Sequence, residues 1–468
     1  MSDVKEKKGM SVTTRSFLTA IAVIFALMVL TYLLTFLIPG GEYPRIPNEN
    51  GDLLIDTSGE FRTVEGGISF VRWILSPVLV LTAEGSVTLI AVIAFLLIIG
   101  GVFNSLNQCG LMNYMLKRIV HTFGAKRYTL LSAVSLFFMA MGSFIGSFEE
   151  CVPMVPIVVA LSVGLGWDAL TGLGMSLLAV GCGFAAGICN PFTVGISQRL
   201  AGLPMFSGMW YRAVAFALIY GLLMLFLHRH ARRVEKPLPS AAADTFVREK
   251  KMDRALLLFG GILGFGILLI LSSVFLPFLQ DYTMIIVAVM FLAAGISSAL
   301  ASGMGGKALG STFLSGLVSM LPGVLMILMA ASIKFTLEEA NILDTLLHSA
   351  VTAAATMPRW AVILFIYLIA LVMNFFISSG SAKAFLLMPL VVPMAQIFHI
   401  PAQLCVMAYA FGDGFSNVFY PTNPVLLISL GLAGTDYGTW AKWSGKFQLL
   451  NLLLTSGLLL LGLAIGYC

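Results

Sequence analysis

Charged residues are scarce in this sequence. Only 10% of the 468 residues are Asp, Glu, Lys or Arg, and 59% are hydrophobic, whereas an average soluble domain has about 25% charged residues. Apolar runs of roughly 20 residues, the length of helix that spans a bilayer core, recur from Phe17 to the C-terminus. This composition excludes a soluble globular domain and predicts an all-α polytopic membrane protein. The net charge of +5 lies almost wholly in loops, so we expect membrane lipids around the protein and no nucleic-acid partner.

Patterns that would indicate an enzyme or a metal site are also missing. The six cysteines form no CxxC pair and most lie in apolar segments, which is typical of buried free thiols. All five histidines fall at segment ends, so no base lies near a membrane-embedded serine nucleophile. The segment ASGMGGKALG resembles a phosphate loop but has Ala301 and Ala308 at two defining positions. We therefore expect no enzyme, no ATP-driven pump, no metal and no cofactor.

The charges in the loops predict an orientation. The tail 1–16 and the loop 229–254 are rich in Lys and Arg, and the positive-inside rule places such segments in the cytoplasm. The loop between Pro39 and Arg72 holds six acidic residues against three arginines and follows the first span, so it is expected outside. We predict a multi-pass protein of the inner (cytoplasmic) membrane with a cytoplasmic N-terminus and an external C-terminus.

The hydrophobic pattern predicts about nine transmembrane helices and two re-entrant hairpins. The predicted spans are 17–38, 86–107, 169–202, 209–228, 255–279, 282–302, 313–336, 404–432 and 443–465. If the apolar segment 128–166 crossed the membrane once, the basic loop 229–254 would move outside. We therefore interpret 128–166 as a hairpin that enters and leaves from the cytoplasm, and 360–399 as a hairpin that opens from the other side.

Three short motifs recur in the same order. FIGS at Phe144 returns as FISS at Phe376, GCGF at Gly181 as GDGF at Gly412, and the Asn-Pro pair at Asn190 as the pair at Asn423. The separations are 232, 231 and 233 residues. The pattern predicts a first inverted repeat over 17–228, a cytoplasmic linker over 229–254, a connecting helix over 255–281 and a second repeat over 282–468. Inverted repeats with interrupted helices are typical of secondary transporters, whose sites lie at the breaks.

Four interrupted segments are expected to form the site: two hairpin tips, 142–150 and 376–383, and two broken spans, 187–195 and 417–425. Prolines and glycines interrupt each of them. The predicted substrate contacts are Glu149, Glu150, Asn190, Thr193, Ser379, Ser381, Lys383 and Asn423. The predicted contacts of a coupling ion, a proton or sodium, are Ser147, Asn190, Ser378, Asp413 and Thr422. For each Ser, Thr or Asn, helix capping is the alternative.

Ionisable residues within the apolar segments indicate function, because a charge at the bilayer centre costs at least about 2.5–3.5 kcal/mol. Glu149 and Glu150 are interpreted as contacts for a substrate cation, with a salt bridge to Lys383 across the two tips as the alternative. Lys383 is also a candidate contact for a substrate carboxylate. For Asp413 an ion site and a packing hydrogen bond remain equally open.

The segments IPGGEY (38–43), NPFTVGISQ (190–198), SSGSAKA (378–384) and FGDGFSN (411–417), with the Glu149–Glu150 pair, resemble the YfcC family. That family is similar to arginine/ornithine antiporters and anaerobic dicarboxylate carriers of the ion transporter superfamily. The resemblance implies a homodimer in which a mobile transport domain moves against a scaffold by an elevator mechanism. Relatives are expected to have a neutral residue at the position of Lys383 and no Asn-Pro pair at 423–424.

The predicted function is secondary active transport of an amino acid. Two glutamates favour an ammonium or guanidinium group, while half-helix N-termini and Lys383 favour a carboxylate. A basic amino acid, exchanged as arginine and ornithine are or taken up with sodium or protons, is the first choice. A carrier of C4-dicarboxylates is the alternative, and a channel is a remote one.

Overall fold

The computed structural model describes residues 14–47, 53–55, 60–83, 86–146, 148–237, 248–272, 283–354 and 356–468. Helices dominate. The first part of the chain contains α1 (Thr14–Leu37), α2 (Phe70–Leu79), α3 (Ser86–Gln108), α4 (Leu111–Phe123), η1 (Gly124–Lys126), α5 (Arg127–Ala140), η2 (Met141–Ile145), η3 (Glu149–Met154), α6 (Val155–Gly164), α7 (Ala169–Leu173), η4 (Gly174–Leu178), α8 (Ala179–Ala186), η5 (Pro191–Gly195), α9 (Ile196–Leu200) and α10 (Met209–Val234).

The second part contains α12 (Lys250–Ser272), α13 (Thr283–Ala301), α14 (Gly306–Ser319), α15 (Leu321–Glu339), α16 (Leu343–Ala354), α17 (Arg359–Phe376), α18 (Gly380–Ile397), α19 (Ala402–Asn417), α20 (Pro424–Leu432) and α21 (Tyr437–Ile465). Within the described residues, eight helices are long and apolar enough to cross a membrane. The prediction of a polytopic helical membrane protein is confirmed. The count of nine spans, the re-entry of the two hairpins and the inversion of the repeats stay predictions.

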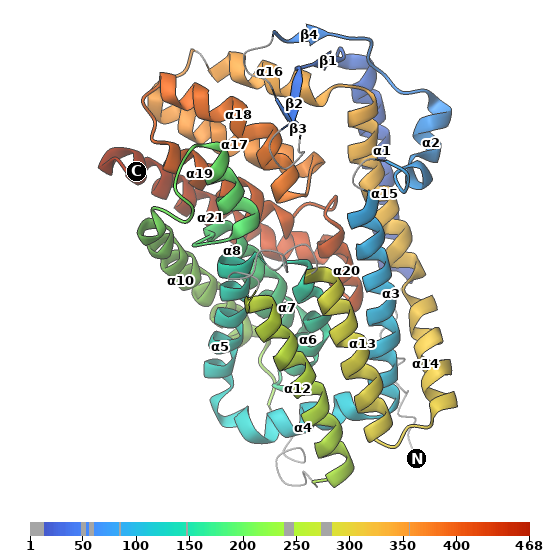
Figure 1. Ribbon diagram of the computed structural model, residues 1–468. Coiled ribbons are helices and arrows are strands. Elements are labelled where there is room, and N and C mark those ends of the chain that lie inside the picture. Colours follow the sequence, from blue (N-terminus) through green and yellow to red (C-terminus); the bar gives the residue numbers. More distant parts are fainter. Residues whose placement is uncertain are drawn as a thin grey trace.

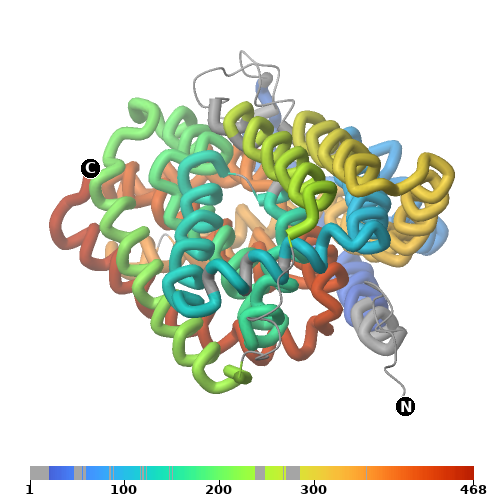
Figure 2. The backbone as a smooth tube through the Cα atoms, turned by 90° about the horizontal axis from the view of Figure 1, so that it is seen from below, coloured from blue at the N-terminus to red at the C-terminus, as the bar shows by residue number. Residues whose placement is uncertain are grey.

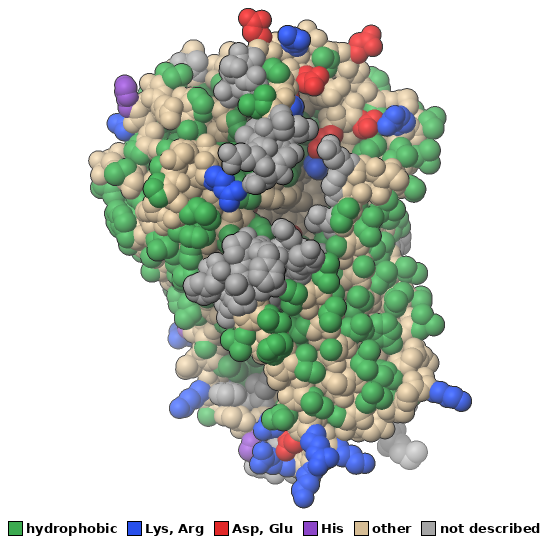
Figure 3. Space-filling model, viewed as in Figure 1, with side chains coloured by type: hydrophobic (Ala, Val, Ile, Leu, Met, Phe, Trp, Pro, Cys, Tyr) green, Lys and Arg blue, Asp and Glu red, His purple; other side chains and the backbone are tan. Residues whose placement is uncertain are grey.

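The helices form two bodies that lie side by side (Figures 1 and 2). One is a column in which α1 packs on α15, and α3 packs on α13 and α14. The other holds α5–α10 and α17–α21. Hydrophobic side chains cover much of the middle of the face in Figure 3, whereas Lys and Arg gather at its lower end and Asp and Glu lie mostly at its upper end. This distribution suits a protein whose middle is embedded in lipid.

The order of helices repeats along the chain. α4 and α16 begin 232 residues apart, as do α5 and α17, while α7 and α19, and η5 and α20, begin 233 residues apart. The repeat read from three short motifs therefore extends to whole helices. Each hairpin also contacts the broken span of the other half: α18 packs on α9 and η5, and α20 packs on α6 and η3.

The centre of the second body is the contact between α8 and α19, the helices that precede the two breaks. Every residue of α8 and every residue of α19 from Gln403 to Asn417 is buried. Their sequences, AVGCGFAA and AQLCVMAYAFGDGFSN, are rich in Gly and Ala. Small residues allow close approach of helices in membranes, where lipid is as apolar as the side chains.

Several elements were not predicted. The loop 39–72 contains two short antiparallel pairs, β1 (Gly41–Glu42) with β4 (Arg62–Thr63) and β2 (Arg45–Pro47) with β3 (Leu53–Ile55). The helices α4 and α16 were not among the predicted elements. The single predicted span 313–336 corresponds to two helices, because α14 is followed almost directly by α15. The tail 1–13 and the linker residues 238–247 lie outside the description, so the predicted tail is mostly untested.

Candidate functional site

Both Asn-Pro pairs start a helix. Asn190 Oδ1 accepts hydrogen bonds from the main-chain nitrogens of Phe192 (2.9 Å) and Thr193 (3.3 Å), and Pro191 follows as the first helical residue. Asn is a preferred N-cap, and proline at the next position loses no intrahelical hydrogen bond. The sequence analysis treated the prolines only as breakers of a span. Asn-Pro in this chain ends one half-helix and begins the next.

The second break is capped in the same way. Asn423 Oδ1 accepts a hydrogen bond from the nitrogen of Val425 at 2.9 Å, and Pro424 begins α20. Here the Nδ2 group is used as well, since it donates to Oδ1 of Asn417 at 2.8 Å. The helix-capping alternative is therefore correct for Asn190 and Asn423, and it does not exclude a ligand contact through a remaining polar atom.

The first hairpin tip lies against the first break. Ile188 donates its main-chain N–H to Ser143 Oγ at 3.0 Å, and Cys189 donates to the carbonyl of Ser143 at 3.2 Å. Gly146 has φ 75°, and a Cβ atom there would lie 2.3 Å from Asn190 Oδ1. Only glycine permits both this backbone conformation and this contact.

The second hairpin tip reaches the same place from the other half. A Cβ atom on Gly380 would lie 2.8 Å from Cγ2 of Thr193 and 3.1 Å from Oδ2 of Asp413. Tyr409 in α19 donates its hydroxyl to the carbonyl of Gly380. The tip of one half, the break of the other half and α19 therefore meet at Gly380. Two of the four segments predicted to converge, 376–383 and 187–195, are in contact here.

Lys383 and Asp413 form an ion pair at the centre of the second half. Lys383 Nζ lies 2.5 Å from Asp413 Oδ1, and both side chains are fully buried. Lys383 also donates to Oδ1 of Asn374 and to the carbonyl of Ile377, the latter at 3.3 Å. The amide nitrogen of Asn374 continues the network to Asn417 Oδ1 (3.0 Å). A buried charge is tolerated when it is paired and hydrogen-bonded in this way.

Among the described side chains, the ion-pair partner of Lys383 is Asp413, so the alternative of a salt bridge from Lys383 to the glutamate pair stays a prediction for Glu150. For Asp413, a structural contact with Lys383 is present, and its second oxygen remains available. Glu149 is half-buried at the first residue of η3. The side chain of Glu150 and the whole of Ser147 lie outside the described residues, so both predictions stay untested.

Four predicted site residues share one property. Each is buried and carries a polar side-chain atom that has no hydrogen-bond partner within the described part of the chain: Asn190 Nδ2, Thr193 Oγ1, Asp413 Oδ2 and Thr422 Oγ1. An unpaired buried polar group costs about 1–3 kcal/mol. Atoms of this kind at the junction of interrupted helices are candidates for ligand contacts.

The three serines of the second tip are less buried. Ser379 is exposed, Ser378 and Ser381 are half-buried, and Ser379 accepts a hydrogen bond from Ala382 N at 3.4 Å as the N-cap of α18. The hydroxyls of Ser379 and Ser381 lie 3.4 Å apart. These serines are therefore at the rim of the junction, whereas Asn190, Thr193 and Asp413 are buried inside it.

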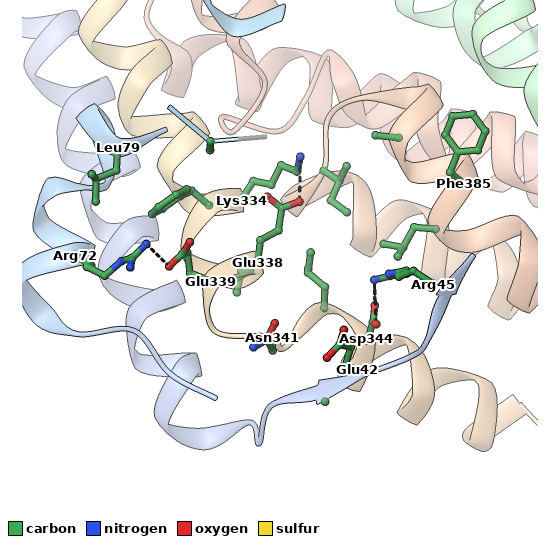
Figure 4. Close-up of a pocket in the computed structure, with 18 of the residues that line it drawn as sticks. Glu42, Arg45, Arg72, Leu79, Lys334, Glu338, Glu339, Asn341, Asp344 and Phe385 are labelled. Atoms are coloured by element: carbon green, nitrogen blue, oxygen red, sulfur yellow. Dashed lines mark hydrogen bonds and ion pairs between the residues drawn. The ribbon is translucent and has the colours of Figure 1, made fainter. Parts of the chain in front are cut away.

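A cavity of about 820 Å³ lies beside the second tip. It opens between the column, which contributes α2 and α15, and α18 of the second body (Figure 4). Ile377 and Ala382 of the tip belong to its lining, and Ile377 is also the residue whose carbonyl contacts Lys383. The cavity therefore reaches one end of the buried network.

The wall of this cavity is charged but largely self-compensated. Three ion pairs line it (Figure 4): Arg45–Asp344 at 2.9 Å, Arg72–Glu339 at 2.7 Å and Lys334–Glu338 at 3.1 Å. Glu42 adds a fourth carboxylate. Lys334 was expected at an interface with water, and its half-exposed place in this wall agrees with that expectation.

Sequence analysis missed a buried arginine. Arg212, in the first turn of α10, is fully buried and donates to the carbonyls of Ile188 (3.2 Å) and Ser207 (2.8 Å) and to the hydroxyl of Tyr467 (3.1 Å). It ties the first break to the C-terminal end of the chain. An arginine one turn inside the apolar run WYRAVAFALIYG is the signal that was available.

Asn374 and Asn417 were missed as well. Each lies in an apolar helix and contributes to the network around Lys383 and Asp413, and their role depends on the packing of α17 against α19.

The described residues contain no group of three His, Cys, Asp or Glu side chains that could hold a metal ion.

Known proteins resemble the whole chain. The family model of DcuC, the C4-dicarboxylate anaerobic carriers, matches residues 17–464. This chain belongs to the DcuC family. Among its relatives is YfcC of Escherichia coli (strain K12), described as a candidate basic amino acid antiporter, which is 30% identical over 81% of this chain and 79% of its own. The resemblance to YfcC is confirmed.

A second relative of this DcuC-family chain is an uncharacterised protein of Haemophilus influenzae, 24% identical over 94% of this chain and 95% of its own. Two solved transporters align over nearly the full length. They are YdaH of Alcanivorax borkumensis (20% identity, TM-score 0.45, 96% of this chain and 98% of that one) and MtrF of Neisseria gonorrhoeae (15%, 0.44, 95% and 95%). Both TM-scores are below 0.5, so the assignment as a membrane transporter rests on the family and the close relative.

Proposed function

We propose that this DcuC-family protein is a secondary active transporter of an amino acid across the cytoplasmic membrane, with a basic amino acid as the first candidate. The observation that carries the proposal is the set of four buried, unpaired polar atoms at the junction. Asn190 Nδ2 and the hydroxyls of Thr193 and Thr422 can donate to a carboxylate, while Asp413 Oδ2 can accept from an ammonium group. An α-amino acid carries both groups.

The positions of these atoms support binding by both halves. Thr193 lies one turn after Asn190 at the start of η5, where Asn190 Oδ1 takes the first main-chain N–H groups and leaves Asn190 Nδ2 and Thr193 Oγ1 as the donors for a carboxylate. The methyl group of Thr193 and Oδ2 of Asp413 both border Gly380. Glu149 and Glu150 follow the first tip and are proposed to contact the side-chain cation of a basic amino acid. The name of YfcC agrees with this substrate class.

Coupling and motion are part of the proposal. Ser147, Asn190, Ser378, Asp413 and Thr422 are proposed to serve a coupling ion, either sodium or a proton. The cavity between the column and α18 suits an access route from the end of the molecule that bears β1–β4. A homodimer, an inverted repeat and an elevator movement of the second body against the column are proposed with it. The basic lower end would face the cytoplasm.

Transport of a C4-dicarboxylate is the second candidate, favoured by the family description. Counterflow in proteoliposomes separates the two. Vesicles loaded with arginine, ornithine, a neutral amino acid or succinate are tested for uptake of the labelled compound, with and without a sodium gradient. Accelerated arginine uptake supports the proposal. Uptake of succinate alone, unchanged by Glu149→Gln and Glu150→Gln, contradicts it, and conductance without saturation or counterflow would indicate a channel.

A further inference from the structure

The ammonium group of Lys383 lies among oxygen atoms of three different kinds. Asp413 contributes a carboxylate oxygen at 2.5 Å, Ile377 a main-chain carbonyl oxygen at 3.3 Å, and Asn374 its side-chain amide oxygen. Lys383 and Asp413 have no exposed surface, and Asn374 is 1% exposed. Carboxylate, amide and main-chain oxygens are the ligands that hard metal cations take in proteins.

The charge of this group of oxygens selects a monovalent cation. Among the described side chains, Asp413 is the single carboxylate in contact with Lys383 Nζ, and Asn374 and Ile377 contribute neutral dipoles. One positive charge neutralises the group, whereas a divalent ion would leave an unpaired charge in a buried place, which is strongly unfavourable. The covalently attached ammonium of Lys383 supplies that single charge.

The first half has no counterpart to this arrangement. The separations that relate the repeated motifs place small, uncharged residues at the equivalent positions: Gly142 for Asn374, Cys151 for Lys383, Cys182 for Asp413 and Ala186 for Asn417. The lysine and the oxygens around it are thus present together in one half and absent together from the other. This joint occurrence is expected if the lysine and its oxygen ligands act as one unit.

We propose that the ammonium group of Lys383 is a tethered cation that fills a monovalent-cation site formed by Asp413, Asn374 and the carbonyl of Ile377. A variant that removes the ammonium and leaves space opens this site to Na⁺. For transport, the inference rests on the proposed function and narrows it: at this site the native protein carries its own cation, so Asp413 would not hold sodium, and a coupling sodium would bind at the other residues proposed for it.

The test is thermal unfolding of purified Lys383→Ala in detergent, in sodium chloride and in choline chloride of equal ionic strength. A cation that binds only the folded state raises Tm with its concentration. We expect sodium to raise the Tm of Lys383→Ala by several degrees more than it raises the Tm of the native protein, whose response reports only a coupling ion bound elsewhere.

Three matched variants isolate the cause. Lys383→Met removes the charge but fills the space, so it should not respond to sodium. Lys383→Ala combined with Asp413→Asn has space but no charge to neutralise, and should not respond either. Leu387→Ala removes a buried side chain one turn further along α18; it creates space without a carboxylate and should behave alike in both salts.

An equal sodium response in the native protein, or none in Lys383→Ala, overturns the proposal. If Lys383→Ala yields no folded protein in choline, the proposal requires that purification in sodium restores it and that the double variant folds in either salt. Failure in both salts also overturns it. Because these measurements use no substrate, they do not depend on the transported compound; a sodium-dependent Lys383→Ala without amino acid counterflow would refute the proposed function alone.

Discussion

At the break before α20 the side chain of Asn423 is hydrogen-bonded through both its oxygen and its nitrogen, whereas at the break before η5 the nitrogen of Asn190 has no partner among the described residues. The two breaks share the same Asn-Pro start and the same position in the repeat. They differ in what surrounds them. The second half holds Lys383, Asp413, Asn374 and Asn417 in one buried network. Small uncharged residues stand at the equivalent positions of the first half, where Arg212 of α10 contacts the carbonyl of Ile188 beside the break.

The difference indicates that the two halves serve the site in different ways. A closed polar network rigidifies the place where it lies, and it is costly to leave partly satisfied. The second half is therefore suited to hold its hairpin tip against α19. Among the described residues, both halves keep unpaired polar atoms: donors at Asn190 and Thr193 in the first half, and Asp413 Oδ2 and Thr422 Oγ1 in the second. The first half keeps its donors without an ion pair beside them, which suits the binding of a ligand that is bound and released.

Breaking the ion pair should have the largest effect. Asp413→Asn leaves the Lys383 ammonium buried without its counter-charge, and a loss of about 3–5 kcal/mol of unfolding free energy is expected. Combination with Lys383→Met should recover much of it. At the equivalent position of the first half, Cys182→Ala should cost about 1 kcal/mol. Denaturation in detergent measures all four proteins; equal losses in Asp413→Asn and Cys182→Ala would contradict the difference between the halves.

The next largest effect is expected on transport, from a change at the contact between the tip at Gly380 and the break at Thr193. In Gly380→Ala the added methyl group would lie 2.8 Å from Cγ2 of Thr193, so the second tip must move away from the first break. We expect counterflow to fall at least about tenfold, since small misplacements at a site cost about a hundredfold. Gly457→Ala in α21 is the control, because its added Cβ meets no atom within 4 Å. Full activity of Gly380→Ala would refute the contact as a functional one.

The N-caps of η5 and α20, Asn190 and Asn423, can be compared by replacing each with alanine. Removal of an Asn cap costs about 1 kcal/mol, and Asn423→Ala also removes the bond to Asn417. We expect Asn423→Ala to lower Tm more than Asn190→Ala does, and Asn190→Ala to weaken substrate binding more, seen as a raised half-saturation concentration in uptake. The reverse order would show that the unpaired nitrogen of Asn190 is not a ligand contact.

The smallest effect lies outside the membrane segments. Asp168 caps α7, where the second half has Pro401 with no side-chain cap. Burial alone would raise the pKa of Asp168, but hydrogen bonds with His230 and Thr171 outweigh it and hold the pKa below its ordinary value. The Asp168 carboxyl has a pKa of about 3.9 in the unfolded chain and a lower pKa in the folded protein. Its full stabilisation is therefore present above about pH 3.9 and is lost as the pH falls through the pKa that it has in the folded protein.

Tm measured between pH 7 and pH 3 tests this interaction. The native protein should lose stability more steeply below about pH 4 than Asp168→Asn, which keeps a capping oxygen and has no charge to titrate. Asp168→Ala should be less stable by about 1 kcal/mol at pH 7 as well. Parallel curves for the native protein and Asp168→Asn would contradict the assignment.

Much of the fold followed from the sequence, because apolar runs, Gly-Pro breaks and a repeated motif are local signals. The helices and both hairpin segments were predicted near their observed bounds. The helices α4 and α16 were missed because, at 13 and 12 residues, they are shorter than the apolar runs of roughly 20 residues that indicate a span. In the site, Asn190, Thr193, Asp413 and Thr422 were predicted, since polar residues beside breaks in apolar segments are conspicuous. Arg212 and Asn374 were not, since each is one polar residue in an apolar stretch of a continuous helix.

The sequence by itself determined that this is a helical membrane protein whose helices break at polar segments, and it predicts a repeated plan, because hydrophobic length and backbone interruption are properties of short segments. Only the tertiary structure decided which charges meet. Lys383 is 30 residues from Asp413 in the sequence and pairs with it in the folded chain, where α18 packs on α19. The pairing of buried charges depends on which helices pack together, and no local pattern encodes that choice.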